Sequence, residues 1–278
     1  MADPPGAARC RSTRLSKSGR CARLCRSACG AFSRGAARRA HLDLAAAALR
    51  QSQLSWVAQL TLEPQHLPMA SPDLLPVELV HPPWWASCDE FLPPNELELV
   101  REAALANPAA YRASAVLNAA GGGVELDIRR SRVRYDEPTI VALFEERLLA
   151  YADNIFERLR IAPFPVQRLE VQLTVTGHGE FFKVHNDNTH AQLRTRRVTF
   201  IYYFHREPRA FEGGNLRLYA SRTDGRRWRE TADFVDIAPV QNRLIVFPSF
   251  LMHELRPVSV PSGRMEDGRF TVNGWFHS

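Results

Sequence analysis

The segment from Gly177 to Asp187, GHGEFFKVHND, is the stretch from which the organisation of the chain can be worked out. Its aromatic and β-branched residues are typical of a strand, and they lead directly into the pair His185 and Asp187. On a strand, residues two apart point to the same side, so the imidazole and the carboxylate converge on one point. Such a pair can supply two of the three protein ligands of an octahedral Fe(II). Because the chain has 9 histidines, a His-x-Asp pair can arise by chance, and the metal hypothesis needs support from other strands.

Composition places the chain among globular proteins. With 278 residues, 45% hydrophobic and 24% charged, it is long enough for one domain plus additional segments. We find neither an apolar run of membrane-spanning length nor the apolar core of a secretory signal, so we expect no membrane association. Beyond residue 68 the only cysteine is Cys88, which favours a reducing, cytoplasmic location. Targeting to an organelle stays open if the N-terminal segment is expressed.

Positive charge is concentrated in residues 1–68. This segment holds 11 of the 36 Lys and Arg residues and 3 of the 30 acidic residues, a net charge of +8. The remaining 25 basic and 27 acidic residues leave residues 69–278 with a net charge of −2. The folded part therefore lacks the surplus of positive charge that binding to nucleic acid requires, and we expect no nucleic-acid partner.

Residues 1–68 have the composition of a disordered basic tail, with one short helix predicted over residues 42–60. Three interpretations compete: a transit-like peptide, a basic arm for nucleic acid, or a start codon placed too early, with Met69 as the true start. We favour the third. Cys21, Cys25 and Cys29 could share one helix face, but no fourth ligand accompanies them, so a zinc or cluster site is not favoured.

Residues 69–278 are predicted to form a single domain with a helical support region over residues 72–160. In this region Asn95, with Glu98 three residues on, predicts a capped helix that ends near Asn107. A strand is expected over residues 124–135. Pro138 then begins a long helix to about Leu159, whose apolar residues recur at every third or fourth position.

The β-rich core is predicted over residues 165–278. Strands are expected at residues 169–175, 180–185, 196–205, 215–220, 242–247, 253–258 and 269–276. Short strands separated by turns indicate an antiparallel sandwich or jelly roll. The fold class is therefore mainly β with flanking helices, and the N-terminal helices should pack on the outer face of one sheet.

Two of these strands alternate strictly between apolar and functional side chains. In the first, Thr199, Ile201 and Tyr203 share one face, and the other face is wholly apolar or aromatic. In the second, one face consists of Arg269, Thr271, Asn273 and Trp275, and the opposite face contains Phe270, Val272 and Phe276. A buried inward arginine requires an anion, because an unpaired buried charge costs several kcal/mol.

A third metal ligand can be found at the start of a later strand. His253 follows the strand of residues 242–247 and could complete a triad with His185 and Asp187. A Gly213-Gly214 turn provides tight backbone before another strand. The ordered set is therefore a His-x-Asp pair, an inward tyrosine, a Gly-Gly turn, a distal histidine, an inward arginine and a tryptophan.

With these residues the chain resembles the prolyl 4-hydroxylase-like branch of the Fe(II)- and 2-oxoglutarate-dependent dioxygenases, over about Trp84 to Ser278. The resemblance implies a double-stranded β-helix in which His185, Asp187 and His253 bind iron. It also implies that Arg269, helped by Tyr203, binds the distal carboxylate of 2-oxoglutarate. Thr199 and Trp275 face the same interior and complete the expected cofactor-binding set.

One departure from the family concerns the arginine. The family usually places this basic residue closer in sequence to the distal histidine than Arg269 lies to His253. The number of residues after His253 alone therefore favours Arg264. Strand parity and the register of Trp275 favour Arg269, because Arg264 belongs to a loop, Pro261–Arg264, that looks inserted.

The resemblance implies Fe(II) as cofactor and 2-oxoglutarate and O2 as co-substrates, with ascorbate as a supporting reductant. The expected reaction is hydroxylation of a C–H bond, with a prolyl or other residue of a peptide or protein as the leading substrate and with release of succinate and CO2. A free amino acid or a small metabolite is the alternative, and a non-catalytic jelly-roll binding module is the alternative of another class. The loops 186–195 and 219–231 do not indicate which substrate is used, and no oligomeric state can be predicted.

The remaining histidines and a few other residues are not expected to bind the metal. His178, His190 and His205 are expected at the surface or at the rim of the site, where His190 and Asn188 could border the substrate. Trp84 and Trp85 are expected to pack at the start of the domain, and Lys183 is expected to be solvated.

Overall fold

The computed structural model describes residues 61–62, 79–116, 123–223, 225 and 227–278, all of which belong to one compact unit. The predictions for residues 1–60, including the three-cysteine spacing and the helix over residues 42–60, lie outside the described residues, as does the start at Met69. Among the described helices, none is both long and apolar enough to span a membrane.

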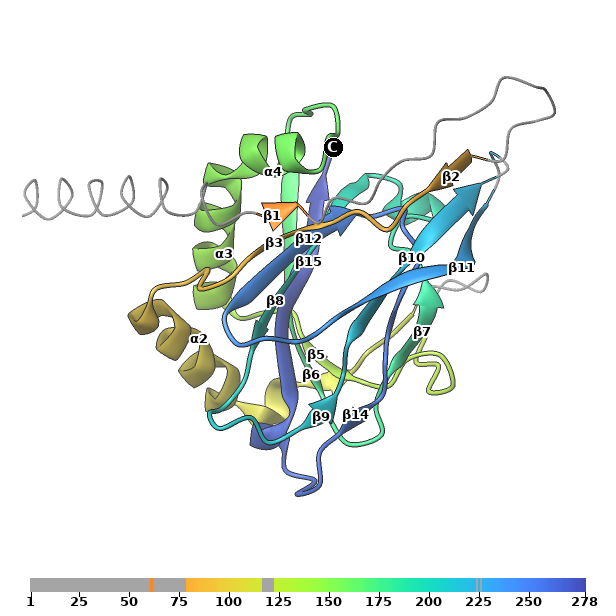
Figure 1. The fold of residues 1–278 in the computed structure, drawn as a ribbon. Helices are drawn as coiled ribbons and strands as arrows, with labels where there is room; N and C mark the ends of the chain where they lie inside the picture. Colours follow the sequence, from red (N-terminus) through yellow and green to blue (C-terminus); the bar gives the residue numbers. More distant parts are fainter. Residues whose placement is uncertain (1–60, 63–78, 117–122, 224, 226) are drawn as a thin grey trace, which may run out of the picture. The chain divides into compact units, whose positions relative to one another are not determined.

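Two antiparallel sheets form the body of the protein (Figure 1). The large sheet has the order β1-β3-β12-β8-β15-β6-β5-β4 and the smaller one β11-β10-β13-β7, with β2 paired to β10. The strands of the large sheet are β1 (Thr61–Leu62), β3 (Ala86–Cys88), β12 (Arg243–Pro248), β8 (Arg196–Phe204), β15 (Arg269–His277), β6 (Arg168–Thr176), β5 (Arg132–Arg134) and β4 (Arg112–Ala113). Those of the smaller sheet are β11 (Trp228–Ile237), β10 (Leu216–Thr223), β13 (His253–Leu255), β7 (Phe182–His185) and β2 (Leu79–His81). A separate pair joins β14 (Val258–Ser259) to β9 (Glu212–Gly213).

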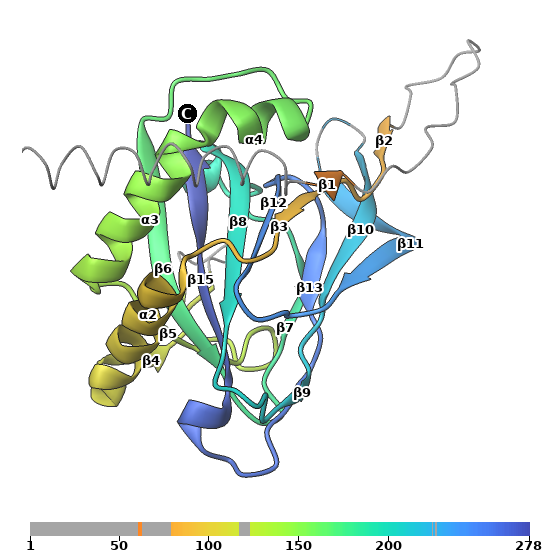
Figure 2. The same ribbon diagram turned by 60° about the vertical axis from the view of Figure 1, so that its left-hand side comes forward.

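Helices α2 (Pro94–Ala106), α3 (Pro138–Ala150) and α4 (Ala152–Arg158) cover the large sheet on the side away from the smaller sheet (Figure 2). The short 3-10 helices are η1 (Pro108–Ala110), η2 (Ala191–Leu193) and η3 (Met265–Asp267). This arrangement confirms the predicted jelly roll with helices on one outer face.

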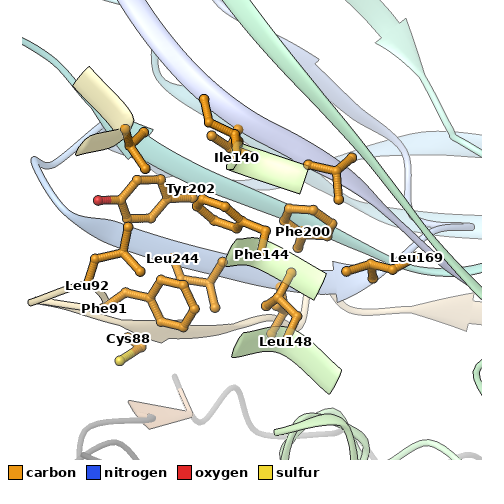
Figure 3. Close-up of a cluster of buried hydrophobic side chains, with 14 of the residues drawn as sticks. Cys88, Phe91, Leu92, Ile140, Phe144, Leu148, Leu169, Phe200, Tyr202 and Leu244 are labelled. Atoms are coloured by element: carbon orange, nitrogen blue, oxygen red, sulfur yellow. The ribbon is translucent and has the colours of Figure 1, made fainter. Parts of the chain in front are cut away.

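The main core lies between the helices and the large sheet. Phe144 and Leu148 of α3 point toward Phe200 and Tyr202 of β8 (Figure 3), and the ring centroids of Phe144 and Phe200 are 6.2 Å apart. Phe270, Val272 and Phe276 of β15 belong to the same cluster. The parity predicted for β8 and β15 is therefore confirmed, because their apolar residues face the helices.

Three local predictions were wrong. Helix α2 begins after Pro93 with no side-chain cap, and Asn95 lies inside its first turn, because Pro94 already supplies the fixed φ suited to a helix start. The predicted strand over residues 124–135 is reduced to β5, since residues 126–128 form a turn. The helix expected up to Leu159 is interrupted at Tyr151, whose φ and ψ of −110° and 6° separate α3 from α4.

The region expected to be a substrate loop, residues 219–231, instead contains much of a hairpin. Strands β10 and β11 pair from Leu216 and Ile237 to Thr223 and Trp228. The sequence predicted the first of these strands over residues 215–220 but missed β11, because most of the β11 side chains are exposed and polar loops use the same residue types.

Candidate metal centre and its cavity

The two candidate histidines lie side by side because two strands pair. Strands β7 and β13 are antiparallel, and their register places His253 opposite His185, with the ring centroids 4.2 Å apart. Asp187 follows the end of β7, where its backbone N–H donates to the carbonyl of Ser249 at 2.9 Å. Sheet pairing thus brings together residues that are far apart in sequence.

The ligand atoms of these three residues meet at one point. Asp187 Oδ1 lies 3.7 Å from His185 Nε2, and Asp187 Oδ2 lies 3.6 Å from His253 Nε2. The three ligand atoms all lie within 4.8 Å of one another. Two imidazole nitrogens and one carboxylate, leaving further positions open, are the donor set that non-haem Fe(II) uses. The residues present therefore fit such a metal.

Hydrogen bonds orient both rings for metal binding. His185 Nδ1 lies 2.7 Å from the carbonyl of Lys183, and His253 Nδ1 lies 2.9 Å from the carbonyl of Leu251. Because a carbonyl can only accept, each Nδ1 carries the proton, and each Nε2 keeps its lone pair toward the shared point. The ring of Phe182 stacks on that of His185 with centroids 3.5 Å apart, which further fixes its orientation.

The electrostatics of the site also favour the metal-binding protonation states. Burial, with a further contribution from His253, lowers the pKa of His185 to about 3, so its imidazole is neutral at physiological pH. Burial opposes ionisation of Asp187, but the nearby His253 and His185 outweigh it and hold the pKa of this carboxyl below its usual value. Thr199 helps by donating its hydroxyl to Asp187 Oδ2 at 2.7 Å.

A cavity of about 600 Å³ lies between the two sheets, and the triad lines it. Thr199, Arg269 and Trp275, which were predicted as cofactor-binding residues, line the same cavity. Tyr203 contacts Arg269, and its ring centroid lies 4.9 Å from the guanidinium carbon. The structure therefore brings all seven sequence-predicted site residues to one region, although Tyr203 does not itself line the cavity.

Arg269 is a buried cation for which no acidic partner is found among the described residues. Its side chain is 4% exposed, and Nε donates to the carbonyl of Gly214 at 2.9 Å. The hydroxyl of Tyr203 is buried without a hydrogen-bond partner in the described part of the chain. Burial lowers the pKa of Arg269, and Tyr203 opposes this effect. A guanidinium and a free hydroxyl in this setting fit a carboxylate ligand.

The Gly213-Gly214 turn allows Arg269 to take this position. Gly214 has φ of +69°, and a Cβ atom there would lie 2.7 Å from Cδ of Arg269. Only glycine combines this backbone conformation with such a close approach.

Arg264, the alternative from counting, lies outside the cavity. Its side chain is 55% exposed and forms hydrogen bonds from Nε and Nη2 to Asp267 at 2.9 and 2.8 Å. Geometry therefore favours Arg269 as the residue that faces the metal triad.

Several cavity residues were not singled out from the sequence. On β6 the polar residues of one face line the cavity, namely Glu170, Gln172, Thr174 and Thr176. Their alternation with Leu169, Val171, Leu173 and Val175 was visible, and the parity that located Arg269 could have found them. Arg196 also lines the cavity. Its Nη2 lies 2.8 Å from Glu170 Oε1, and its guanidinium carbon lies 3.4 Å from the ring centroid of Trp275. Arg129 follows a turn rather than a regular strand, so no periodicity pointed to it.

The minor expectations had mixed outcomes. His190 lines the cavity, and His178 is exposed. His205 is buried, which makes its expected surface position wrong: its backbone N–H donates to the side chain of Gln241 at 2.7 Å. Lys183 is exposed as expected, and Trp85 packs in the second core cluster.

The fold and the site together define a jelly roll in which a candidate His-Asp-His metal site and a buried arginine line one cavity. Comparisons with known proteins agree with this class. Residues 171–277 match the sequence profile of the 2OG-Fe(II) oxygenase superfamily. An uncharacterized PKHD-type hydroxylase of Synechocystis sp. is 36% identical over 149 residues, which are 53% of this chain. The chain spans about half, 49%, of the length of that curated relative.

One of two similar solved structures shows the same fold. A prolyl hydroxylase of Trichoplax adhaerens, determined with a peptide fragment of a hypoxia-inducible factor, superposes with a TM-score of 0.50 at 20% identity, over 69% of this chain and 83% of that one. A prolyl-4-hydroxylase of Pseudomonas putida has a TM-score of 0.49 at 22% identity, over 70% and 92% of the two chains. The profile match over residues 171–277 and the PKHD-type relative support the resemblance to prolyl 4-hydroxylase-like 2OG-Fe(II) oxygenases found in the sequence. Fe(II), 2-oxoglutarate and O2 are the cofactor and co-substrates that this family implies.

Proposed function

We propose that the chain is an Fe(II)- and 2-oxoglutarate-dependent dioxygenase that hydroxylates a C–H bond of a prolyl or other residue in a peptide or protein, with release of succinate and CO2. The observation that carries the proposal is the presence, in one cavity, of a complete His-Asp-His triad and a buried arginine that has no acidic partner in the described part of the chain. Each would serve one part of the same chemistry, because the triad can hold Fe(II) and the arginine can hold a dicarboxylic co-substrate.

In this proposal His185, Asp187 and His253 bind the metal, and their Nδ1 and Thr199 hydrogen bonds keep them aligned for it. When bound, Fe(II) together with 2-oxoglutarate and O2 supplies the oxidant for C–H hydroxylation. Arg269 orients the far carboxylate of 2-oxoglutarate with its planar fork of donors, and Tyr203 offers a further hydroxyl. Asp187, His253 and Arg269 are buried where they line the cavity, which strengthens their electrostatic interactions with a ligand.

A peptide substrate is supported by one comparison, and the size of the cavity is compatible with it. The related Trichoplax structure holds a peptide fragment, and the cavity of about 600 Å³ has room for a side chain beside the co-substrate. A free amino acid or a small metabolite would fit the same space and is the second candidate. A non-catalytic module would be expected to have lost a metal ligand or the buried arginine, and this chain has both.

The test is succinate release from 2-oxoglutarate in the presence of Fe(II) and pools of peptides or free amino acids. We expect wild-type turnover to be abolished in His185→Ala and strongly reduced in Arg269→Ala. Arg264→Ala is the matched control, because this arginine lies outside the cavity. Full turnover in His185→Ala would disprove the metal assignment, and a loss confined to Arg264→Ala would show that Arg269 is the wrong anchor.

A further inference from the structure

Arg129 is one of three arginines that line the cavity, and backbone hydrogen bonds fix its position next to the candidate metal site. Residues 128–130 run along β7 and exchange backbone hydrogen bonds with it: Lys183 N–H donates to Ile128 at 2.9 Å, and Arg130 N–H donates to Phe181 at 2.8 Å. Arg129 itself forms a bridge with Phe182. The position of Arg129 is therefore tied to the strand that carries His185.

The side chain of Arg129 stacks on the ring of Phe182, which in turn stacks on the candidate metal ligand His185. Its guanidinium carbon lies 4.8 Å from the ring centroid of Phe182, and that ring in turn stacks on His185. Nε donates to Ser131 Oγ at 3.0 Å, and Ser131 Oγ also pairs with Ser114 Oγ at 2.8 Å. This fixes the plane of the guanidinium, while its two Nη atoms have no hydrogen-bond acceptor among the described residues.

The other arginines of the cavity already have partners or roles. Arg196 pairs with Glu170 through two contacts at 2.8 and 2.9 Å, and Arg269 is assigned to the co-substrate under the proposed function. Arg129 has neither. Of the charged groups nearby, Asp187 attracts the guanidinium and Arg196 repels it, and the Asp187 carboxylate is assigned to the metal under the proposed function. Glu125 lines the cavity as well, but it is not among those groups.

Arg129 is partly buried, and no acidic side chain among the described residues forms an ion pair with it. Removing it from water without an anionic partner is costly, and the cost is recovered when a carboxylate binds the free Nη donors. The location decides which ligand this is: Arg129 flanks the metal triad on the Phe182 side, whereas the co-substrate is assigned to Arg269 on β15.

We propose that Arg129 binds a carboxylate of the substrate, so that the residue to be hydroxylated carries an acidic side chain, an acidic neighbour or a free α-carboxylate. This inference rests on the proposed function and narrows it to acidic substrates. The carboxylate could come from an aspartate or glutamate side chain or from a free C-terminus, and the experiment separates these two sources.

Three matched peptide pools provide the test. The first contains Asp- and Glu-bearing peptides with free C-termini, the second replaces Asp and Glu by Asn and Gln, and the third has amidated C-termini. Binding is measured by retention on immobilised protein loaded with Mn(II) and 2-oxoglutarate, which does not depend on turnover. Succinate release with Fe(II) is the second readout.

Wild-type protein should retain the pool that keeps the recognised carboxylate and lose the pool that lacks it. Arg129→Gln should weaken this retention on the order of tenfold or more, as expected for a charge-assisted hydrogen bond, and Arg129→Lys should restore part of it. Arg130→Gln is the control, because this neighbouring side chain is 48% exposed and does not line the cavity. Loss in the second pool identifies a side-chain carboxylate, and loss in the third identifies a terminal one.

Two results would overturn the inference. One is equal retention of all three pools, or no retention, by the wild-type protein. The other is a fall in 2-oxoglutarate affinity in Arg129→Gln, measured by calorimetry on the Mn(II) form, which would assign Arg129 to the co-substrate. Carboxylate-dependent retention without any succinate release would instead contradict the proposed function and leave the binding role of Arg129 intact.

Discussion

The two faces of β8 and β15 use the same strands for opposite purposes. Phe200 and Val272 point away from the cavity and pack under the helices, while their sequence neighbours Thr199 and Thr271 line the cavity. Each face has its own requirement, since the outer face needs apolar volume and the inner face needs polar groups at fixed positions. A substitution on the outer face should therefore affect mainly stability, and a substitution on the inner face should affect mainly the chemistry of the site.

The largest effect is expected from the inner face at Asp187. Replacing Asp187 with Ala removes the ligand that lies between the two histidines and should abolish Fe(II)-dependent turnover, with at least a 100-fold loss of metal affinity. Because the folded protein holds the pKa of Asp187 below its usual value, the carboxylate also stabilises the metal-free protein at neutral pH, so Asp187→Ala should lower its thermal midpoint modestly. Asp127→Ala is the control, since that side chain is 96% exposed. Retained Fe(II) binding in Asp187→Ala would show that Asp187 is not a metal ligand.

The outer face should show the reverse pattern. Phe200→Ala removes a fully buried ring that contacts Phe144 and Phe276, and it should lower the free energy of unfolding by about 3–5 kcal/mol. Phe234→Ala on β11 serves as the control, because that ring is 46% exposed, and it should cost far less. Urea unfolding measures both. If the folded fraction of Phe200→Ala bound Mn(II) much more weakly than wild type, the two faces would not be separable.

The turn against Arg269 gives a smaller and more selective effect. Gly214→Ala and Gly225→Ala both force a side chain into a left-handed backbone, with φ of +69° and +83°, at a cost of roughly 1–2 kcal/mol each. Only the first places Cβ against Arg269, whereas a Cβ at Gly225 meets nothing within 4 Å. Gly214→Ala alone should therefore weaken 2-oxoglutarate binding by about tenfold, a free-energy change of about 1.4 kcal/mol. Calorimetric titration distinguishes the two variants, and equal affinities would mean that Arg269 does not bind the co-substrate.

Parity explains how much could be predicted from the sequence. Strict alternation in β8 and β15 located Arg269, Thr199 and Trp275, and a His-x-Asp pair with one distal histidine located the triad. Arg129 could not be found in this way, because it reaches the cavity from a segment without regular alternation, through pairing with β7 that only the fold reveals. Strand β11 was missed for a related reason, since most of its residues are exposed and it lacks the apolar alternation that marks a half-buried strand.

The smallest effect is expected outside both faces, in the loop that carries Arg264. There Asp267 accepts hydrogen bonds from Ser262, Arg206 and Arg264, and these three groups hold the pKa of its carboxyl well below the usual range. A carboxyl with a lowered folded-state pKa stabilises the protein above its unfolded pKa of about 3.9, and this contribution is lost as the pH falls toward the folded value. Asp267→Asn should therefore slightly lower the thermal midpoint at pH 7 and leave a shallower decline below about pH 4. Glu266→Gln, next to it and partly exposed, is the control. An unchanged acid profile in Asp267→Asn would show that this loop contributes nothing to stability, whereas a change in 2-oxoglutarate affinity would reopen the choice between Arg264 and Arg269.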